Sequence, residues 1–167
     1  SPLSLQAVRS RAKAILATPA PAVARQTQLA LLGEELLAAR RPRAAFEVYG
    51  LARARLERWR TTGDFVPLER SLLRVALTST AALRHRADFE ALLGSAASEL
   101  GESLCAESET LSVAMSSAAA VGWRQNALAA NASLHDAGLT PSSAALAALM
   151  EDALARGDAE CALDTFV

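Results

Sequence analysis

Apolar residues recur along the chain at the spacing of one face of an α-helix. Leu146, Leu149, Met150 and Leu154, for example, follow one another within three turns, so they share one side of a helix and can be buried together. The same pattern predicts helices over residues 4–16, 26–40, 43–60, 67–85, 88–101, 107–121, 124–137, 142–156 and 159–167. The chain is therefore expected to be all-α.

A repeat becomes visible when the C-terminal helices are compared at an offset of 35 residues. Identical residues share this offset in the pairs Leu111 and Leu146, Met115 and Met150, Gly122 and Gly157, Ala127 and Ala162, and Leu128 and Leu163. The glycines stand where a helix must end, and glycine tolerates the left-handed conformation found at helix C-termini. Each unit is thus predicted to be two antiparallel helices joined at a glycine turn.

Helix pairs of this kind stack into an α-solenoid, in which each unit contacts only its neighbours. We expect an N-terminal helix with a Pro-rich spacer over 1–25, a helix pair over 26–60, a degenerate repeat with an insertion loop over 61–107, a repeat over 108–142 and a partial repeat over 143–167. No feature of the sequence indicates a boundary to a separate second domain.

Composition supports this fold and adds an asymmetry of charge. Alanine and leucine, which are strong helix formers, dominate the apolar residues, and aromatic residues make up only 4% of the chain. Residues 1–60 contain eleven Lys and Arg against four Asp and Glu, a net charge of +7, whereas residues 101–167 contain two against nine, a net charge of −7. The N-terminal part is therefore suited to a polyanion, which the C-terminal part would repel.

The best-formed units resemble the pentatricopeptide repeat family. The resemblance is carried by "TLSVAMSSAAAVGWRQNALAANASLHDAGLTP" followed by "SAALAALMEDALARGDAECALDTF", with a first helix, a Gly turn, an Ala-Leu step and a closing Gly-Xaa-Xaa-Pro. The earlier stretch "LALLGEELLAARRPRAAFEVYGLA", within residues 26–59, looks more like a tetratricopeptide repeat. Both families build α-solenoids, so the resemblance implies the same stacked helix pairs.

Pentatricopeptide proteins are typically organellar RNA-binding proteins in which each unit reads one base with two or three side chains. The resemblance assigns the reading positions to Ser112 and Ser142 in the best-formed unit and to Ala147 in the last unit. An alanine cannot hydrogen-bond a base, and the preceding unit offers Leu77 and Glu107. The sequence therefore departs from the base-reading pattern outside the Ser112 and Ser142 pair.

A cluster of arginines offers a different kind of RNA contact. Its members are Arg40, Arg41, Arg43, Arg53, Arg55, Arg58 and Arg60. Arginine binds phosphate bidentately, and such contacts position a protein on RNA without reading its sequence. A solvated helix face is the alternative explanation of the same residues.

Catalysis and metal binding find no support in the sequence. It contains no phosphate loop, no nucleophile with an adjacent base and no metal-ligand spacing, so we expect no catalytic residues, no metal and no cofactor. Cys105 and Cys161 form no CxxC pair and are expected to be buried thiols. No stretch is long and apolar enough to span a bilayer, and we expect neither membrane insertion nor a small-molecule substrate.

These observations favour a non-catalytic scaffold subunit of an organellar ribonucleoprotein, either the mitochondrial ribosome or an associated RNA-processing assembly, which contacts RNA backbone and neighbouring protein subunits. The first acidic residue is Glu34, and the acid-free stretch before it is typical of an organelle transit region. We therefore expect a mitochondrial location, with the chloroplast as the alternative. The alternative functions are a sequence-specific organellar RNA-binding protein and a tetratricopeptide-type adaptor or accessory subunit of a membrane complex without RNA.

Overall fold

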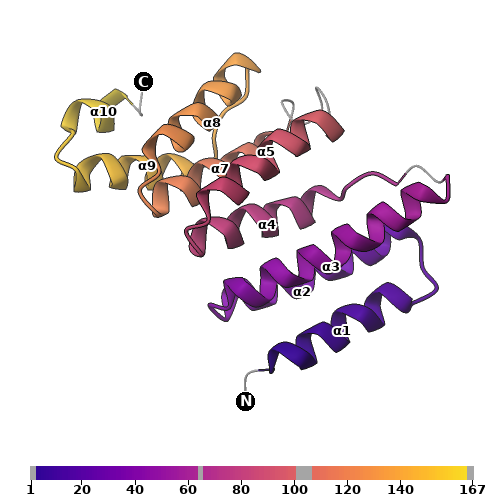
Figure 1. Cartoon of the computed structure of the whole chain (residues 1–167). Coiled ribbons are helices and arrows are strands. Elements are labelled where there is room, and N and C mark those ends of the chain that lie inside the picture. The colour runs from indigo at the N-terminus through magenta and orange to yellow at the C-terminus, as the bar shows by residue number, and fades with distance from the viewer. Residues whose placement is uncertain (1–2, 64–65, 101–106, 165–167) are drawn as a thin grey trace. The chain divides into compact units, whose positions relative to one another are not determined.

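The computed structural model describes residues 3–63, 66–100 and 107–164, and every regular element in these residues is a helix (Figure 1). The helices are α1 (Leu5–Ala17), α2 (Ala22–Ala38), α3 (Pro42–Thr61), α4 (Arg70–Ala82), α5 (Arg86–Leu100), α7 (Ser108–Ala120), α8 (Arg124–Asp136), α9 (Ser143–Ala155) and α10 (Ala159–Asp164). The prediction of an all-α protein is confirmed, and most helix bounds lie close to the predicted ones.

Two helices differ from the sequence prediction. Helix α2 begins at Ala22, directly after Pro21, rather than at residue 26, because proline is tolerated at the start of a helix. The Pro-rich spacer is correspondingly shorter. Helix α4 covers Arg70–Ala82 instead of 67–85, because the backbone before it is hydrogen-bonded to a side chain of α2 rather than to a helical turn.

That side chain is the amide of Gln26, which is fully buried. Its Nε2 donates to the carbonyl of Pro67 at 3.0 Å, and its Oε1 accepts from the backbone N–H of Glu69 at 2.8 Å. The amide thus satisfies two backbone groups that would be costly to bury unpaired. It ties the segment before α4 to α2.

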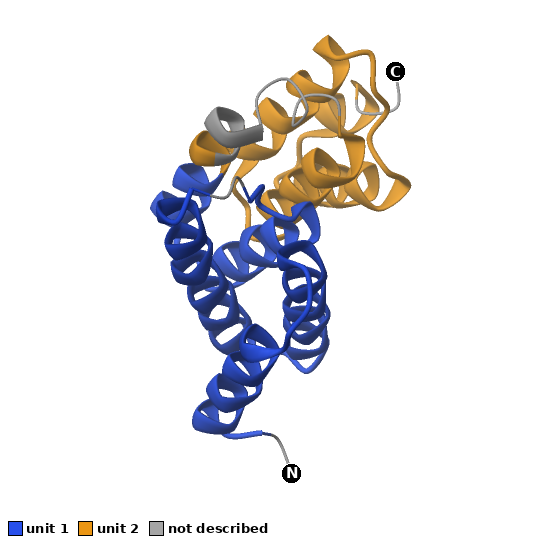
Figure 2. Ribbon diagram, turned by 90° about the vertical axis from the view of Figure 1, so that its right-hand side faces the viewer, with its two compact units in different colours: residues 1–92 blue, residues 93–167 orange. Residues whose placement is uncertain are grey.

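The chain divides into two compact units, residues 1–92 and residues 93–167, which Figure 2 shows in blue and orange. The division falls inside α5, so a helix continues across it and no turn marks it in the sequence.

Unit 1 is built around the antiparallel pair α2 and α3, with α4 packed against both and α1 packed mainly against α3 (Figure 1). Leu29 of α2, Leu56 of α3 and Leu72 of α4 are fully buried in this core. Helices α2 and α4 approach closely at Gly33, where an added Cβ would lie 2.5 Å from Cγ1 of Val75. The missing side chain allows this approach.

Unit 2 is centred on α7. Helix α7 packs against α8 and α9, and α10 packs against α9. Met115 of α7, Leu134 of α8 and Leu149 of α9 are buried. Helix α9 starts at a side-chain cap, because the hydroxyl of Ser142 accepts from the backbone N–H of Ala145 at 3.1 Å.

Helices α2, α4, α7 and α9 end in the same kind of turn. The residue after the helix C-cap has a left-handed backbone, and the next N–H donates to the carbonyl five residues back, in a Schellman motif. The donor and acceptor pairs are Arg41 and Leu36 at 2.8 Å, and His85 and Thr80, Trp123 and Ala118, and Asp158 and Ala153 at 2.9 Å each. Gly122 and Gly157 have φ of +79° and +75°, which confirms their predicted role.

Arginine takes the left-handed position in the two turns of unit 1. Arg40 has φ of +58° and Arg84 has φ of +60°. A residue with a Cβ pays about 1 kcal/mol for this conformation, whereas glycine does not. Arginine therefore occupies these two positions although glycine would fit the backbone conformation better.

Candidate functional site

The seven arginines of the predicted RNA-contacting cluster lie on and beside α3 but do not share one face. Arg53 and Arg60, two turns apart, have intramolecular partners: Arg53 Nε lies 3.7 Å from the carboxylate of Glu57, and Arg60 Nε donates to the carbonyl of Val66 at 3.2 Å. Arg55 and Arg58, three residues apart, occupy the other flank of the helix. The remaining three, Arg40, Arg41 and Arg43, stand together at the α2–α3 turn.

A second group of arginines joins these three. Helices α2 and α4 pack together and run in the same direction, so the α2–α3 and α4–α5 turns lie at the same end of unit 1, at the left of Figure 1. This places Arg84 and Arg86 on the same side as the first turn. We call Arg40, Arg41, Arg43, Arg84 and Arg86 the basic edge. The sequence interpretation missed its second half because those residues lie in another helix pair.

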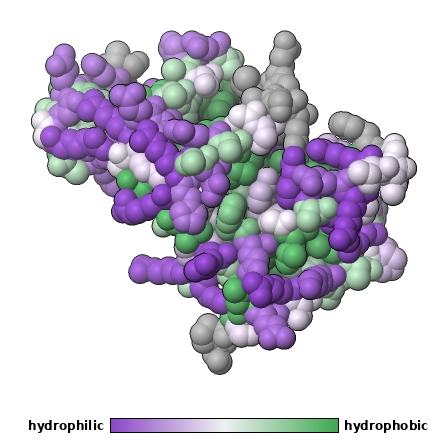
Figure 3. All heavy atoms as spheres, viewed as in Figure 1, coloured by the Kyte–Doolittle hydropathy of each residue, from purple (hydrophilic) through white to green (hydrophobic). Residues whose placement is uncertain are grey.

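The side chains of the basic edge are accessible. Arg40, Arg43, Arg84 and Arg86 are exposed, and Arg41 is half-buried. Among the described residues, Arg40, Arg41 and Arg43 have no side-chain hydrogen bond or ion pair, while Arg86 lies 3.3 Å from Glu90. Figure 3 shows hydrophilic side chains projecting from this end of unit 1.

The base-reading positions behave differently. The structure brings Ser112 and Ser142 together, as the repeat register requires, but the contact is internal: the backbone N–H of Ser142 donates to Ser112 Oγ at 3.0 Å. Ser112 is only 4% exposed, and the Ser142 hydroxyl caps α9. Ala147 is exposed and has no polar atom on its side chain. Both serine hydroxyls therefore have structural partners.

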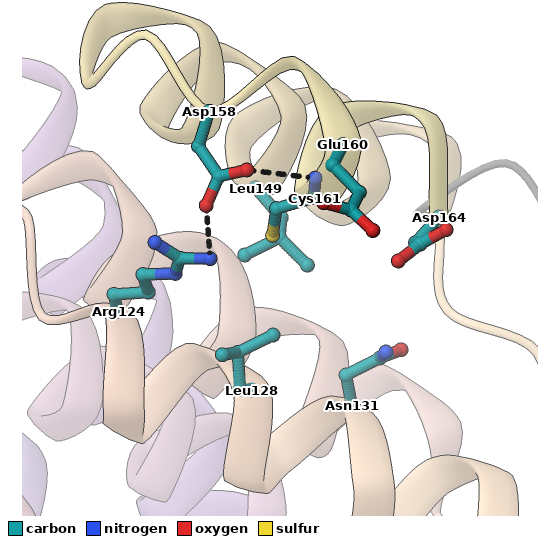
Figure 4. Close-up of a pocket in the computed structure, with 8 residues that line it drawn as sticks. All are labelled: Arg124, Leu128, Asn131, Leu149, Asp158, Glu160, Cys161 and Asp164. Carbon is teal, nitrogen blue, oxygen red and sulfur yellow. Dashed lines mark hydrogen bonds and ion pairs between the residues drawn. The ribbon is translucent and has the colours of Figure 1, made fainter.

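Unit 2 contains a cleft that the sequence did not indicate. It has a volume of about 370 Å³ and lies between α8, α9 and α10, lined by Arg124, Leu128, Asn131, Leu149, Asp158, Glu160, Cys161 and Asp164 (Figure 4). Arg124 Nη2 lies 2.7 Å from Oδ2 of Asp158, and Asp158 Oδ1 accepts from the backbone N–H of Cys161 at 2.9 Å. Asp158 thus joins the start of α8 to the start of α10. These two interactions are enough to hold the Asp158 carboxylate in place without a ligand.

The same interactions shift the pKa of Asp158. The backbone N–H of Cys161, and then Arg124, stabilise the carboxylate and hold the pKa of Asp158 below its ordinary value of about 3.8. Arg124 in turn has a raised pKa because of its hydrogen bond to Asp158.

A lowered folded-state pKa means that ionised Asp158 stabilises unit 2 above about pH 4 and that this contribution is lost as the pH falls through the lowered value. We expect the protection factor of the Cys161 amide proton, which compares its exchange rate with that of an unfolded chain at the same pH, to fall on acidification over this range. Asp158→Asn should remove that pH dependence while leaving the amides of α7 unaffected. An identical acid profile in the wild type and in Asp158→Asn would contradict the assignment.

The remaining chemical groups are dispersed. Among the described residues no three His, Cys, Asp or Glu side chains are close enough to hold a metal ion. Cys161 is half-buried rather than fully buried, and Cys105 lies outside the described residues. His85 is exposed, 3.7 Å from Asp88. None of the described helices is both long and apolar enough to cross a membrane.

Comparison with known proteins adds no relative: no family model, no curated protein and no solved structure matches the chain. The resemblance to pentatricopeptide and tetratricopeptide repeats therefore stays a prediction that rests on the quoted residues.

Proposed function

We propose that the chain is a non-catalytic helical-repeat scaffold in an organellar ribonucleoprotein, either the mitochondrial ribosome or an RNA-processing assembly associated with it. Its helix pairs stack as a solenoid, and its basic edge binds the phosphate backbone of RNA. Neighbouring protein subunits bind the acidic unit 2.

The observation that supports RNA binding is the basic edge. It gathers five arginines from the α2–α3 and α4–α5 turns at one end of unit 1, which is the arrangement that a phosphate chain running across the turns would need. Arg40 and Arg84 keep their positions at a cost in backbone strain. Strain of this kind is found where function selects a residue that stability would not. These arginines also lie favourably near the C-terminal ends of α2 and α4, which offsets part of that strain.

Backbone contact is favoured over sequence reading by the state of the reading positions. A base-reading hydroxyl must face the RNA, whereas Ser112 is buried against the N–H of Ser142. The proposed contact is consequently independent of RNA sequence.

Replacing both strained arginines by glycine separates binding from folding. The Arg40→Gly, Arg84→Gly double variant is expected to remain folded, because relief of the left-handed backbone, worth about 1 kcal/mol per site, offsets the loss of the contact that Arg84 makes, yet to bind RNA about tenfold more weakly. The slope of log affinity against log salt should shrink in magnitude by about 1.4, or 0.7 per lost phosphate contact on single-stranded RNA. Fluorescence anisotropy with a short single-stranded RNA and its scrambled counterpart measures both quantities.

The matched control is Arg55→Gln, Arg58→Gln, which removes the same charge from the flank of α3. It should change RNA affinity less than the glycine variant does. Equal losses in the two variants would place the contact elsewhere on unit 1, and discrimination between the two RNAs would favour the sequence-specific alternative.

The cellular part of the proposal is tested by sedimenting organelle lysate with and without RNase. Co-migration with ribosomal particles that is lost after RNase treatment supports it. A large complex that RNase does not change would instead favour a protein-binding adaptor.

A further inference from the structure

A groove runs between α1 and α3 in unit 1 and meets the basic edge at Arg43. We call it the α1–α3 groove. It has a volume of about 590 Å³. Both of its walls are packed helices of the same unit, so the groove lies between two neighbours rather than on the outer side of a terminal helix. Its apolar lining consists of Leu5, Phe46, Gly50 and Leu51.

The apolar lining comes mainly from the outward side of α3. This helix turns Val48, Ala52 and Leu56 into the core. Phe46 and Gly50 are four residues apart and therefore share a different side of the same helix. Phe46 is half-buried and stacks on Tyr49, with ring centroids 6.0 Å apart. Helix α3 thus carries a second apolar stripe that the core does not use.

Gly50 makes this stripe hollow. It is exposed, and an added Cβ would meet nothing within 4 Å in the described part of the chain. Packing within unit 1 therefore does not require a glycine here, although glycine costs about 1 kcal/mol relative to alanine inside a helix. The missing side chain lets another molecule approach the backbone of α3 closely.

The charges around the groove favour an anion. Arg9 of α1 and Glu47 of α3 form an ion pair across it and offset each other. Arg43 is exposed and has no side-chain hydrogen bond or ion pair among the described residues. It is also the second residue of α3, whose first turn contains no acidic side chain, so the positive end of the helix dipole adds to its charge. The uncompensated charge at the mouth is positive.

The size of the groove favours a small molecule. Its lining on α3 extends from Arg43 to Leu51, eight residues, which corresponds to about 12 Å along a helix. Small-molecule sites typically have volumes of about 300–1,000 Å³ and an apolar lining with a few polar groups. A stable protein interface instead takes about 800 Å² from each partner, more than so short a groove offers.

We infer that the α1–α3 groove binds a small amphiphilic carboxylate, with the chemistry of a medium-chain fatty acid. The carboxylate pairs with the guanidinium of Arg43, which can bind it bidentately. The apolar chain lies over Gly50, against Phe46 and Leu51. This inference does not depend on RNA binding.

The test titrates the full chain, labelled with ¹⁵N, with sodium octanoate and separately with octan-1-ol, which has the same chain length and no charge. The amide signals of Gly50 and its neighbours should shift and saturate with octanoate. Arg43→Gln should weaken octanoate binding about fivefold, the size of a well-formed exposed ion pair. It should leave octan-1-ol binding unchanged, because the alcohol makes no ion pair.

Two glycine substitutions locate the apolar part of the site. Gly50→Leu fills the groove and should weaken binding of octanoate at least tenfold. The matched control is Gly94→Leu in α5, at a second exposed helical glycine whose added Cβ would meet nothing within 4 Å and which does not line the groove. It should leave octanoate binding unchanged. Gly50→Leu keeps every arginine, so it should not change the affinity for RNA.

Three results would overturn the inference. The first is the absence of a saturable shift at Gly50 with octanoate. The second is octanoate binding that Gly50→Leu does not weaken, or that both glycine substitutions weaken equally. The third is an Arg43→Gln variant that binds octanoate as the wild type does, or that loses octanoate and octan-1-ol to the same extent, because Arg43 would then not select a carboxylate.

Discussion

Replacing Gly33 by leucine is expected to destabilise unit 1 by about 1–2 kcal/mol. A Cβ at this position would lie 2.5 Å from Cγ1 of Val75, and a valine in a helix has little freedom to turn its side chain away. Overpacking of this kind typically costs about 1–3 kcal/mol. The better helix propensity of leucine, worth about 0.8 kcal/mol, offsets only part of the clash. Urea unfolding, with amide exchange in α2 and α4 as a local probe, measures the loss.

Gly50 of α3 provides the matched control. It is also a glycine inside a helix of unit 1, but an added Cβ there would meet nothing within 4 Å. Gly50→Leu should therefore be neutral or stabilising. A second check is Val75→Ala in the Gly33→Leu background, which should recover part of the lost stability. Equal effects at Gly33 and Gly50 would show that the α2–α4 contact is looser in solution.

The second large effect concerns two methionines at equivalent positions of the repeat. Met115→Ala is expected to lower the free energy of unfolding by about 3 kcal/mol, because Met115 is fully buried and truncation of a buried methionine leaves a cavity. Met150→Ala, in α9, should cost less than about 1 kcal/mol because its side chain is only half-buried. Denaturant unfolding of the two variants at matched protein concentrations gives the comparison.

Equal losses at Met115 and Met150 would mean that the Met150 side chain is covered in solution. In that case the loss at Met150 would vary with protein concentration if a second copy supplied the cover. Independence of concentration would instead place the cover within the chain.

The helices were predictable because leucine, methionine and alanine recur at helical spacing, although of the four apolar residues of α9 that were expected to be buried together only Leu149 is buried. The turns at Gly122 and Gly157 were predictable for a related reason, since the left-handed backbone there selects glycine. The same rule fails at Arg40 and Arg84, where arginine takes this backbone. The residue types therefore did not show that the turns at Arg40 and Arg84 have the same backbone conformation and hydrogen bond as the turns at Gly122 and Gly157.

The sequence predicts on which side of its helix a residue lies better than it predicts which other helix covers that side. Met115 and Met150 are the same residue at the same point of the repeat, and only the neighbouring helix makes one of them buried. Ser112 is an example from the candidate site. The resemblance assigned its hydroxyl to RNA, but in the structure that hydroxyl accepts a hydrogen bond from the backbone N–H of Ser142. The basic edge likewise depends on two turns meeting in space, which an arginine count along α3 cannot show.

The amide of Gln26 makes the junction before α4 sensitive to a change of a single chemical group. Hydrolysis of that amide to a carboxylate, a form of chemical ageing open to glutamine, would replace the donor that faces the Pro67 carbonyl with a second acceptor. Two oxygens would then face each other in a buried site, while the bond from Glu69 N–H would persist. The junction before α4 would thus lose one of its two side-chain hydrogen bonds through the exchange of a single buried nitrogen atom for oxygen.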